Sequence, residues 1–441
     1  MVEASSRAVA KTRVSTRVFS ENEIREISQK YGTPVFLIDE ETLRRKVREL
    51  EEAFSQFRGA IRIAYSMKAN FNPAMVKVFA SEGILFDVTS LGELYFYDRS
   101  GGSPENAIYT SVTEEEEEFF QVLQSGVSRV VVGSYNGLNN LISASRRAEI
   151  TPKIMVRVNP EVAVKAGIRA SYKHSKFGVP FNSDTTDSAH SLVAKVMDSN
   201  GLIFEGFHFH LGSQIVDPQG FLAALDKLEI FIHRMSREYA GLNVRVIDIG
   251  GGTPVEYGEP VPTPAEIAGM LIPRLNQLAQ RLTSNFTVIL ESGRYLCAES
   301  CVLISKIVNS KTYTDQKLIF VDAGYHLLLD AALLKQEYPQ DVIPKGIYSP
   351  DSRLTVAGRL CDTYDIFPAS PLSNLGGASI GKLLVFRNVG AYSIVFNMPF
   401  HCQTKPAIVM RRMNGDFVVV REPQTIEELY KEEGGELDIT F

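Results

Sequence analysis

Two kinds of hydrophobic pattern alternate along the first two thirds of the chain. Short apolar runs bounded by turn residues are typical of buried strands, whereas longer stretches with apolar residues every three or four positions are typical of helices. The helical pattern is clear at residues 40–57 and 72–83. Eight apolar runs lie among the helical stretches, at residues 61–66, 84–88, 107–111, 129–133, 153–158, 204–212, 244–252 and 286–293.

Eight strands that alternate with helices predict an α/β fold, a parallel (β/α)8 barrel of the TIM type, over residues 39–293. An open, doubly wound sheet is the alternative. The first strand is not followed by the GxGxxG motif of dinucleotide-binding sheets, which favours the barrel.

The pattern changes after about residue 295. Strand-like runs follow one another with turns and few helices, at residues 301–313, 317–324, 353–360, 382–395 and 406–423. This pattern predicts an antiparallel β domain, a sandwich or a small barrel, over residues 294–441. Two domains also suit a chain of 441 residues.

Composition and charge exclude several classes of function. The chain has 46 Lys and Arg against 52 Asp and Glu, and this net charge of −6 gives no electrostatic reason to bind nucleic acid or an anionic membrane. No apolar stretch is long enough to span a bilayer. The acidic run at residues 114–120 is expected to form a solvated helix face.

The cysteines and the N-terminus give information about the cellular compartment in which the protein works. Cys297, Cys301, Cys361 and Cys402 form no CxxC pair, so neither a metal site nor a disulfide framework is expected. They suit a reducing cytoplasm. The first 15 residues are basic and contain Ser and Thr, as in a transit peptide, but a frayed start is the preferred interpretation.

Polar residues recur where the predicted barrel strands end, which is where barrel enzymes carry their chemistry. Lys68 closes the first run, and as a buried amine it either reaches water or acts as a nucleophile toward an aldehyde. Gly250–Gly252 form either a tight turn or a cradle for an anion. The other residues at such positions are Asp87, Arg157, His208, His210, Ser213, Glu291 and Arg294.

Taken together, these residue types predict an aromatic, phosphorylated aldehyde cofactor. Lys68 supplies an imine, and Ser213 with Arg294 adds to the glycine cradle for the phosphate. Glu291 is the candidate partner of a pyridine nitrogen, and His210 is the candidate for stacking on the ring.

Six motifs carry a resemblance to a known family. They are AYSMKAN (64–70), GFHFHLGSQ (206–214), DIGGGTP (248–254), ESGRYL (291–296), CDTYDIF (361–367) and NVGAYSI (388–394). In this order they resemble the fold-type-III pyridoxal 5'-phosphate decarboxylases, most closely the diaminopimelate decarboxylase branch of the ornithine, diaminopimelate and arginine group. The resemblance covers roughly residues 30–410 and implies pyridoxal 5'-phosphate as cofactor. It also implies an alanine-racemase-like fold whose β domain takes in residues 1–38.

The resemblance assigns roles to individual cofactor-binding residues. It makes Lys68 the imine-forming lysine, places Asp87 and Arg157 beside the ring and His210 on its face, and sets Glu291 opposite the pyridine nitrogen. The residues that it places around the phosphate are Ser213, Gly250, Gly251, Gly252, Arg294 and Tyr392.

The resemblance also implies a head-to-tail homodimer with shared active sites and no metal. Cys361 would return a proton to the substrate carbon from across the interface, and Asp362 would receive the distal amine. Tyr392 is expected with these two residues opposite Lys68 of the other subunit, and Arg294 and Tyr392 are also expected to reach the substrate.

Three positions depart from the family's pattern, all expected near the distal end of the substrate: Asp362 stands where the branch more often has glutamate, Tyr364 replaces a usual small residue, and the third position follows VDAG. After VDAG the branch usually carries an arginine for the distal carboxylate of the substrate, whereas AGYHLLLDAALL puts Asp330 there. An aspartate repels a carboxylate and attracts an amine. The predicted activity is therefore α-decarboxylation of a small amino acid. The leading substrate is meso-diaminopimelate, giving L-lysine and CO2, and L- or D-lysine, ornithine or a specialised-metabolism substrate is the alternative. A racemase and a non-catalytic relative stay as further alternatives.

Overall fold

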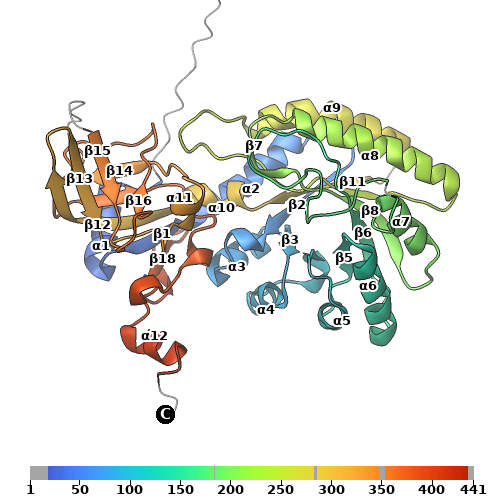
Figure 1. Ribbon diagram of the computed structural model, residues 1–441, viewed down its shortest axis with the longest axis horizontal. Coiled ribbons are helices and arrows are strands. Elements are labelled where there is room, and N and C mark those ends of the chain that lie inside the picture. Colours follow the sequence, from blue (N-terminus) through green and yellow to red (C-terminus); the bar gives the residue numbers. More distant parts are fainter. Residues whose placement is uncertain (1–17, 183, 283–285, 347–352, 436–441) are drawn as a thin grey trace, which may run out of the picture.

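The chain folds into a barrel and a separate β-sheet body that lie side by side (Figure 1). The structure, a computed structural model, describes residues 18–182, 184–282, 286–346 and 353–435. The basic N-terminal stretch with its resemblance to a transit peptide lies outside these residues. Within them, no helix is both long enough and apolar enough to cross a membrane.

The predicted parallel barrel is confirmed. Eight strands close in the order β2-β3-β4-β5-β6-β8-β10-β11, each parallel to its neighbours. Buried side chains such as Leu85, Ile108 and Met155 fill its interior. The strands are β2 Ala60–Ser66, β3 Leu85–Val88, β4 Ala107–Tyr109, β5 Arg129–Val132, β6 Lys153–Arg157, β8 Ile203–His208, β10 Val246–Asp248 and β11 Thr287–Ser292.

Amphipathic helices surround the barrel and bury their apolar faces against it (Figure 1). Polar N-caps fix where several of them begin: the Asp39 carboxylate accepts from the Thr42 amide, and the Ser90 hydroxyl from the Glu93 amide. The helices are α2 Glu40–Phe54, α3 Pro73–Ser81, α4 Leu91–Arg99, α5 Glu116–Gln124, α6 Tyr135–Ala148, α7 Ala189–Met197, α8 Gln219–Glu238 and α9 Pro264–Leu282.

The predicted strand over 204–212 is wrong at its end. β8 stops at His208, and the chain leaves the barrel to form β9 (Gly212–Ile215), which pairs antiparallel with β7 (Ala166–Arg169). Gly212 sits at φ +155, where an added Cβ would lie 2.2 Å from the Ile168 carbonyl oxygen, so this crossing depends on glycine. The excursion places Ser213 above the barrel mouth rather than in its wall.

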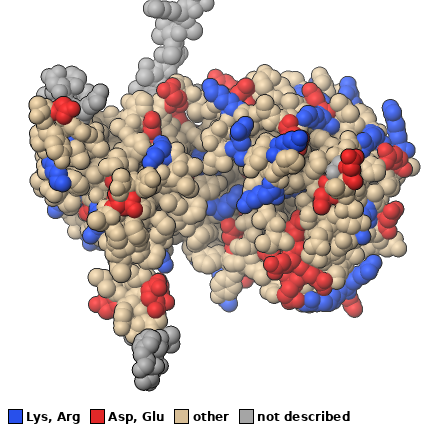
Figure 2. Space-filling view, in the orientation of Figure 1, with Lys and Arg blue, Asp and Glu red and all other residues tan. Residues whose placement is uncertain are grey.

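The acidic run is only partly a solvated helix face. Figure 2 shows acidic side chains gathered over α5, and Glu115 and Glu117 are exposed. Glu114, however, is buried, because its carboxylate accepts hydrogen bonds from the Gly133 amide and the Ser134 hydroxyl. The prediction is wrong at Glu114, which joins the β4–α5 loop to the start of α6.

The second body is a nine-stranded sheet, with β16-β15-β13-β12-β1-β18-β19 as its main path and β17 and β14 off that path. Most pairs are antiparallel, as predicted, but the β13–β15 and β1–β18 pairs are parallel, so the sheet is mixed. Its strands are β1 Val35–Asp39, β12 Cys301–Thr312, β13 Gln316–Val321, β14 Gln340–Ile343, β15 Arg353–Ala357, β16 Ile366–Phe367, β17 Leu383–Phe386, β18 Ile408–Arg411 and β19 Phe417–Arg421.

The N-terminal segment lies with the second sheet. β1 pairs with β12 on one side and with β18 on the other. α1 (Glu21–Tyr31) covers it, with Ile24 and Ile27 in the same apolar cluster as Val35 and Leu37. The chain then crosses directly into the barrel, because Asp39 ends β1 and caps α2. The division at residues 38/39 and 293/294 stays a prediction.

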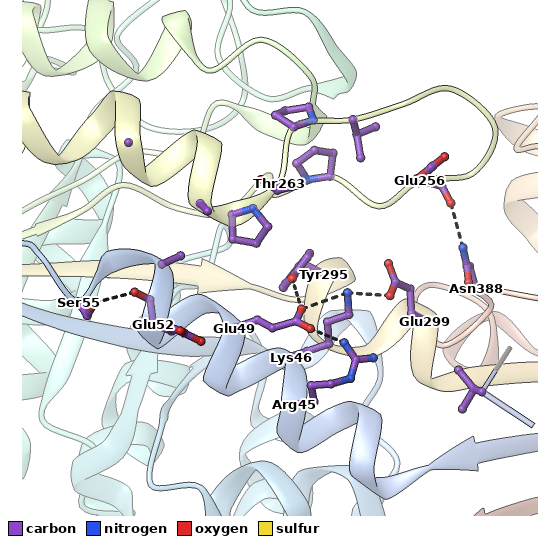
Figure 3. A pocket seen from close by; sticks show the side chains of 18 of the residues that line it. Arg45, Lys46, Glu49, Glu52, Ser55, Glu256, Thr263, Tyr295, Glu299 and Asn388 are labelled. Carbon is purple, nitrogen blue, oxygen red and sulfur yellow. Dashed lines mark hydrogen bonds and ion pairs between the residues drawn. The ribbon is translucent and has the colours of Figure 1, made fainter. Parts of the chain in front are cut away.

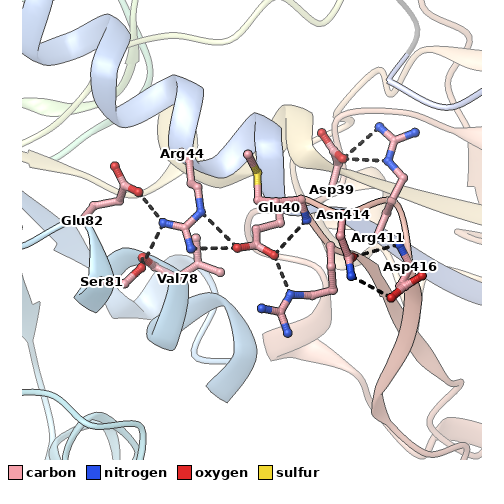
Figure 4. A network of polar contacts seen from close by, with 11 residues as sticks. Asp39, Glu40, Arg44, Val78, Ser81, Glu82, Arg411, Asn414 and Asp416 are labelled. Carbon is pink, nitrogen blue, oxygen red and sulfur yellow. Dashed lines mark hydrogen bonds and ion pairs between the residues drawn. The ribbon is translucent and has the colours of Figure 1, made fainter.

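A network of ion pairs holds the two bodies together at this crossing (Figure 4). The Glu40 side chain is only 2% exposed, and its carboxylate accepts from Arg44 of α2 at 2.7 Å and from Arg412 of the second body at 2.6 Å. Arg44 also donates to Glu82, the residue that follows α3. Asp39 pairs with Arg411 at 2.9 Å. Glu40 is therefore a buried charge between two cations, one from each body.

We expect Glu40→Ala to lower the free energy of unfolding by about 2–4 kcal/mol, because two arginines lose a buried counter-charge. The neighbouring Glu41→Ala is the matched control: Glu41 is 54% exposed and lies 3.5 Å from Arg48, so its loss should cost about 0.5 kcal/mol or less. Chemical denaturation of both variants measures the difference. Equal effects would contradict the role of Glu40.

Candidate active site

Lys68 lies at the mouth of the barrel, in a single 3₁₀ turn (Met67–Ala69) that follows β2. Its Nζ donates to Asp87 Oδ2 at 2.6 Å, and its side chain is 41% exposed whereas Asp87 is fully buried. Desolvation by itself would lower the pKa of Lys68, but the Asp87 and Glu291 carboxylates outweigh it and raise the pKa above its ordinary value. Asp87 therefore stabilises the protonated form of Lys68 and fixes the position of its Nζ.

Three ionisable groups lie together at the ends of β8, β10 and β11. Atoms of His208, Asp248 and Glu291 lie within 4.8 Å of one another, and all three side chains are buried. Burial would raise the pKa of Glu291, yet His208, 3.2 Å away, and Lys68 hold it well below its usual range. Burial and the charge of Glu291 raise the pKa of Asp248. Burial therefore acts on both carboxyl groups, but neighbouring cations outweigh it only at Glu291, whose pKa is lowered, whereas the pKa of Asp248 is raised.

His210 is held as a neutral ring. Its Nδ1 accepts from the Gly251 amide at 3.1 Å, which leaves the ring proton on Nε2. Desolvation, together with the positive charge of Lys68, lowers the pKa of His210 to about 3. Arg157, at the end of β6, stacks its guanidinium 4.7 Å over the Phe177 ring. Both residues keep fixed orientations at the barrel mouth.

The three glycines form a turn that side chains would block. Gly250 has φ +69, and a Cβ at Gly251 would lie 2.4 Å from the Glu291 carbonyl oxygen. A Cβ at Gly252 would lie 2.5 Å from Ile215 Cδ1. Backbone amides that approach this closely without side chains are suited to bind a phosphate.

Arg294 joins this turn to the rest of the cradle. Its Nε donates to Ser213 Oγ at 3.3 Å, and its guanidinium lies 4.7 Å over the Tyr392 ring. Arg294 Nη1 also contacts the hydroxyl of Tyr257 at 3.3 Å. Ser213, Arg294 and Tyr392 are thus brought together as the sequence predicted, and Tyr257 is a neighbour that sequence reasoning missed.

Tyr392 lies beside Lys68 of its own chain and not beside Lys68 of another subunit. Its amide donates to the Ala69 carbonyl at 2.9 Å, and the Asn70 side chain donates to the Gly390 carbonyl at 2.9 Å. The expectation that Tyr392 crosses an interface is wrong, because these bonds fix the 390–392 loop of the second body against the Lys68 turn of its own barrel.

Asp330, in the short helix α11 (Leu329–Leu333), lies directly behind the cradle. It is buried, and its Oδ2 lies 3.8 Å from Arg294 Nη2. Burial raises the pKa of Asp330, and the Arg294 charge opposes this rise. Asp330 is therefore paired with the cation of the cradle rather than left as a free negative charge.

Cys361 and Asp362 stand apart from this cluster. They lie on the turn between β15 and β16, and the Cys361 side chain is exposed. Among the described residues, no hydrogen bond or ion pair joins either of them to Lys68, Glu291 or Arg294 within one chain.

A cavity of about 860 Å³ opens at the junction of the two bodies, on the other side of the short helix α10 (Arg294–Cys297) (Figure 3). Arg294 faces the cradle, whereas the hydroxyl of Tyr295 donates to Glu49 in this cavity at 2.5 Å. Lys46 pairs there with Glu299 at 2.7 Å. Because these charges satisfy one another, the chemistry belongs to the barrel mouth and not to this cavity.

The residues at the barrel mouth fit a pyridoxal phosphate. A cradle of glycine amides, Ser213 and Arg294 lies beside the amine of Lys68, which is paired with Asp87, and the buried carboxylate of Glu291 lies opposite. Among the described residues, Asp87 Oδ1, Asp248 Oδ2 and His208 Nδ1 are buried polar atoms without a hydrogen-bond partner. Such atoms suit a polar ligand. Fold and site therefore define a pyridoxal-phosphate enzyme of the barrel class.

Comparison with known proteins narrows this class. The model of the family "pyridoxal-dependent decarboxylase, pyridoxal binding domain" matches residues 40–298, and the chain belongs to this family of enzymes. A curated diaminopimelate decarboxylase from Methanothermobacter thermautotrophicus is 30% identical, with 92% of each chain covered. One from Archaeoglobus fulgidus is 29% identical over 93% of this chain and 95% of its own.

A solved structure agrees with these relatives. The crystal structure of diaminopimelate decarboxylase from Helicobacter pylori, complexed with L-lysine, aligns with a TM-score of 0.83 at 25% identity. The alignment covers 94% of this chain and all of that one. The predicted fold, family and cofactor are thereby confirmed.

We expect Lys68→Ala to abolish the imine absorbance of the purified protein, because no other amine takes its place beside Asp87. Borohydride should fix the cofactor covalently to the unchanged protein and not to this variant. Lys77→Ala, which removes an exposed lysine of α3, is the control and should leave both signals intact. An imine signal that survives in Lys68→Ala would contradict the assignment.

Proposed function

We propose that this enzyme removes the α-carboxylate of meso-diaminopimelate and yields L-lysine and CO2. The observation that carries the proposal is Lys68 held beside Asp87 and across the barrel mouth from an ionised Glu291. The substrate follows from the relatives, several of which bear the name diaminopimelate decarboxylase. The four cysteines, all free, suit a reducing compartment such as the cytoplasm.

Each group at the barrel mouth has a task in this reaction. The bound pyridoxal phosphate supplies the electron sink that accepts the electron pair left by the departing CO2. Glu291 would hold the proton of the pyridine nitrogen, and His208 lowers the pKa of Glu291. Neutral His210 would lie against the ring without adding charge. Arg294, Ser213 and the glycine turn would hold the phosphate, and Lys68 would supply the amine that binds the aldehyde carbon.

The reaction also needs a proton at the carbon that loses CO2. We assign this proton to the thiol of Cys361, and the distal amine of the substrate to Asp362. Since neither residue contacts the Lys68 cluster of its own chain, we infer a homodimer in which each supplies Cys361 and Asp362 to the other's barrel mouth.

Asp330 supports a second candidate substrate. A diamine acid such as lysine or ornithine ends in an ammonium, which a nearby aspartate favours over a carboxylate by ~1–4 kcal/mol. In this chain Asp330 lies 3.8 Å from Arg294, so part of its charge is already compensated. The pair offers neither a free cation nor a free anion, and for this reason meso-diaminopimelate stays the leading substrate.

We expect CO2 release from a substrate panel to be at least about tenfold more efficient, as kcat/KM, for meso-diaminopimelate than for lysine, ornithine or arginine. The panel includes both enantiomers of lysine and ornithine. Efficient release from a diamine acid, lost in Asp330→Asn, would instead establish the second candidate. Chirality of the remaining substrate, followed in the same assay, should not change, which distinguishes decarboxylation from racemisation.

We expect Lys68→Ala, which is inactive alone, and Cys361→Ala, which alone forms little of the correct product, to recover about a quarter of the unmutated activity when mixed in equal amounts. Random exchange makes half of the dimers hybrid, and each hybrid has one intact site out of two. Fluorescence transfer between labelled subunits verifies the exchange. No recovery after verified exchange would contradict shared sites.

A further inference from the structure

The turn that carries Cys361 is built around a buried carboxylate. Asp365 is 3% exposed, and its two oxygens accept from the Leu360 amide and the Tyr325 amide, each at 2.7 Å. Its own backbone closes the turn, since the Gly358 amide donates to the Asp365 carbonyl at 2.8 Å. A single side chain therefore fixes the residue before Cys361 and the start of the 325–328 loop together.

His401 holds the same turn from the opposite direction. The Cys361 amide donates to Nδ1 of His401 at 3.4 Å. With Nδ1 as the acceptor of this bond, the ring N–H lies on Nε2. The contact is long for a hydrogen bond, so the placement of the imidazole depends on what else surrounds it.

The backbone at His401 is strained to present this ring. His401 has φ +55 and ψ +34, and Cys402 follows at φ +54, so two successive residues other than glycine are left-handed. Residues other than glycine adopt this conformation at an energetic cost and persist in it where the surrounding structure requires it.

A stack of rings completes the arrangement. The Phe400 ring lies 4.0 Å from the imidazole of His401 at an interplanar angle of 27°, and 6.2 Å from the ring of Tyr325 at 25°. Tyr325 is the residue whose amide Asp365 binds. The contacts thus form a closed circuit that runs from Asp365 through Leu360 and Cys361 to His401, Phe400, Tyr325 and back to Asp365.

From this circuit we propose that His401 is a positioning residue for the proton donor: its Nδ1 sets the direction of the Cys361 amide and thereby of the thiol. The inference rests on the proposed role of Cys361. Neither the motif CDTYDIF nor its resemblance points to His401, which lies 40 residues further along the chain.

Displacement of the Cys361 thiol changes the products of the reaction, and this change can be measured. In the normal reaction the thiol proton goes to the substrate carbon that lost CO2, and water then returns a proton to the thiolate. When the thiol is displaced, the proton goes to the aldehyde-derived carbon of the cofactor. One water then releases an aldehyde and leaves the cofactor as pyridoxamine phosphate, with no external oxidant. The fraction of turnovers that end in pyridoxamine phosphate therefore reports the position of the thiol.

The test compares substitutions that keep or remove the acceptor at Nδ1. His401→Asn places Oδ1 where Nδ1 lies and tolerates the left-handed backbone. His401→Gly removes the acceptor and relieves the strain, so it does not endanger folding. His401→Gln carries its oxygen one bond too far.

After acid quench of the holoenzyme reacting with meso-diaminopimelate, chromatography of the cofactor gives the fraction of pyridoxamine phosphate. We expect roughly a three- to tenfold rise in His401→Gly and His401→Gln, and a value within twofold of the unmutated enzyme in His401→Asn. His233→Ala, at an exposed histidine of α8, is the control and should leave the fraction unchanged.

Cys361→Ala separates the two ways in which the proposal fails. If Cys361→Ala raises the fraction and His401→Gly does not, the positioning role is overturned and the role of Cys361 stands. If Cys361→Ala leaves the fraction unchanged, Cys361 is not the donor and both are overturned. Equal rises in His401→Asn and His401→Gly would also overturn the inference, since the acceptor at Nδ1 would then be irrelevant.

Discussion

The balance of buried charge at the barrel mouth is the constraint on which the rest of the site depends. Asp87 and Asp248 are fully buried and Glu291 nearly so, and an ionised carboxylate in such a place costs several kcal/mol unless it is paired. The chain resolves this in three different ways: Asp87 pairs with Lys68, Glu291 lies against His208, and Asp248 accepts from the Gly250 amide while burial and Glu291 raise its pKa. Similar carboxyl groups thereby acquire pKa values shifted in opposite directions, as is common at acid–base sites.

The second body contributes to this balance although its strands lie outside the barrel. Its 390–392 loop is bonded to the Lys68 turn, and the Tyr392 ring covers the guanidinium of Arg294. The lysine is thus held from both sides, by β2 and by the loop. The ion pairs of Glu40 and Asp39 fix the two bodies at the crossing from β1 to α2, so the loop and the lysine keep one relative position.

The barrel and most of the cluster were predictable because they follow from local patterns. Parallel strands buried on both faces appear as apolar runs, and their ends locate Lys68, Asp87, Arg157 and Glu291. The wrong predictions lie where a residue far away in the sequence determines the local structure. Glu114 is buried by the amide of Gly133, β8 ends early because β9 has β7 to pair with, and Tyr392 is fixed by Ala69. The hydrophobic pattern within one segment gives no information about such a partner.

The place of β1 in the second sheet has a consequence for the order of folding. All barrel strands lie between Ala60 and Ser292, so they can pair as soon as that stretch has been synthesised. β1 comes first along the chain, yet its neighbours β12 and β18 begin only at Cys301 and Ile408. At roughly 5–20 residues per second, the apolar strand Val35–Asp39 stays without its sheet for some tens of seconds on the ribosome. During that interval its two unpaired edges are the part of the nascent chain most open to wrong partners, and the barrel is complete before it finds the right ones.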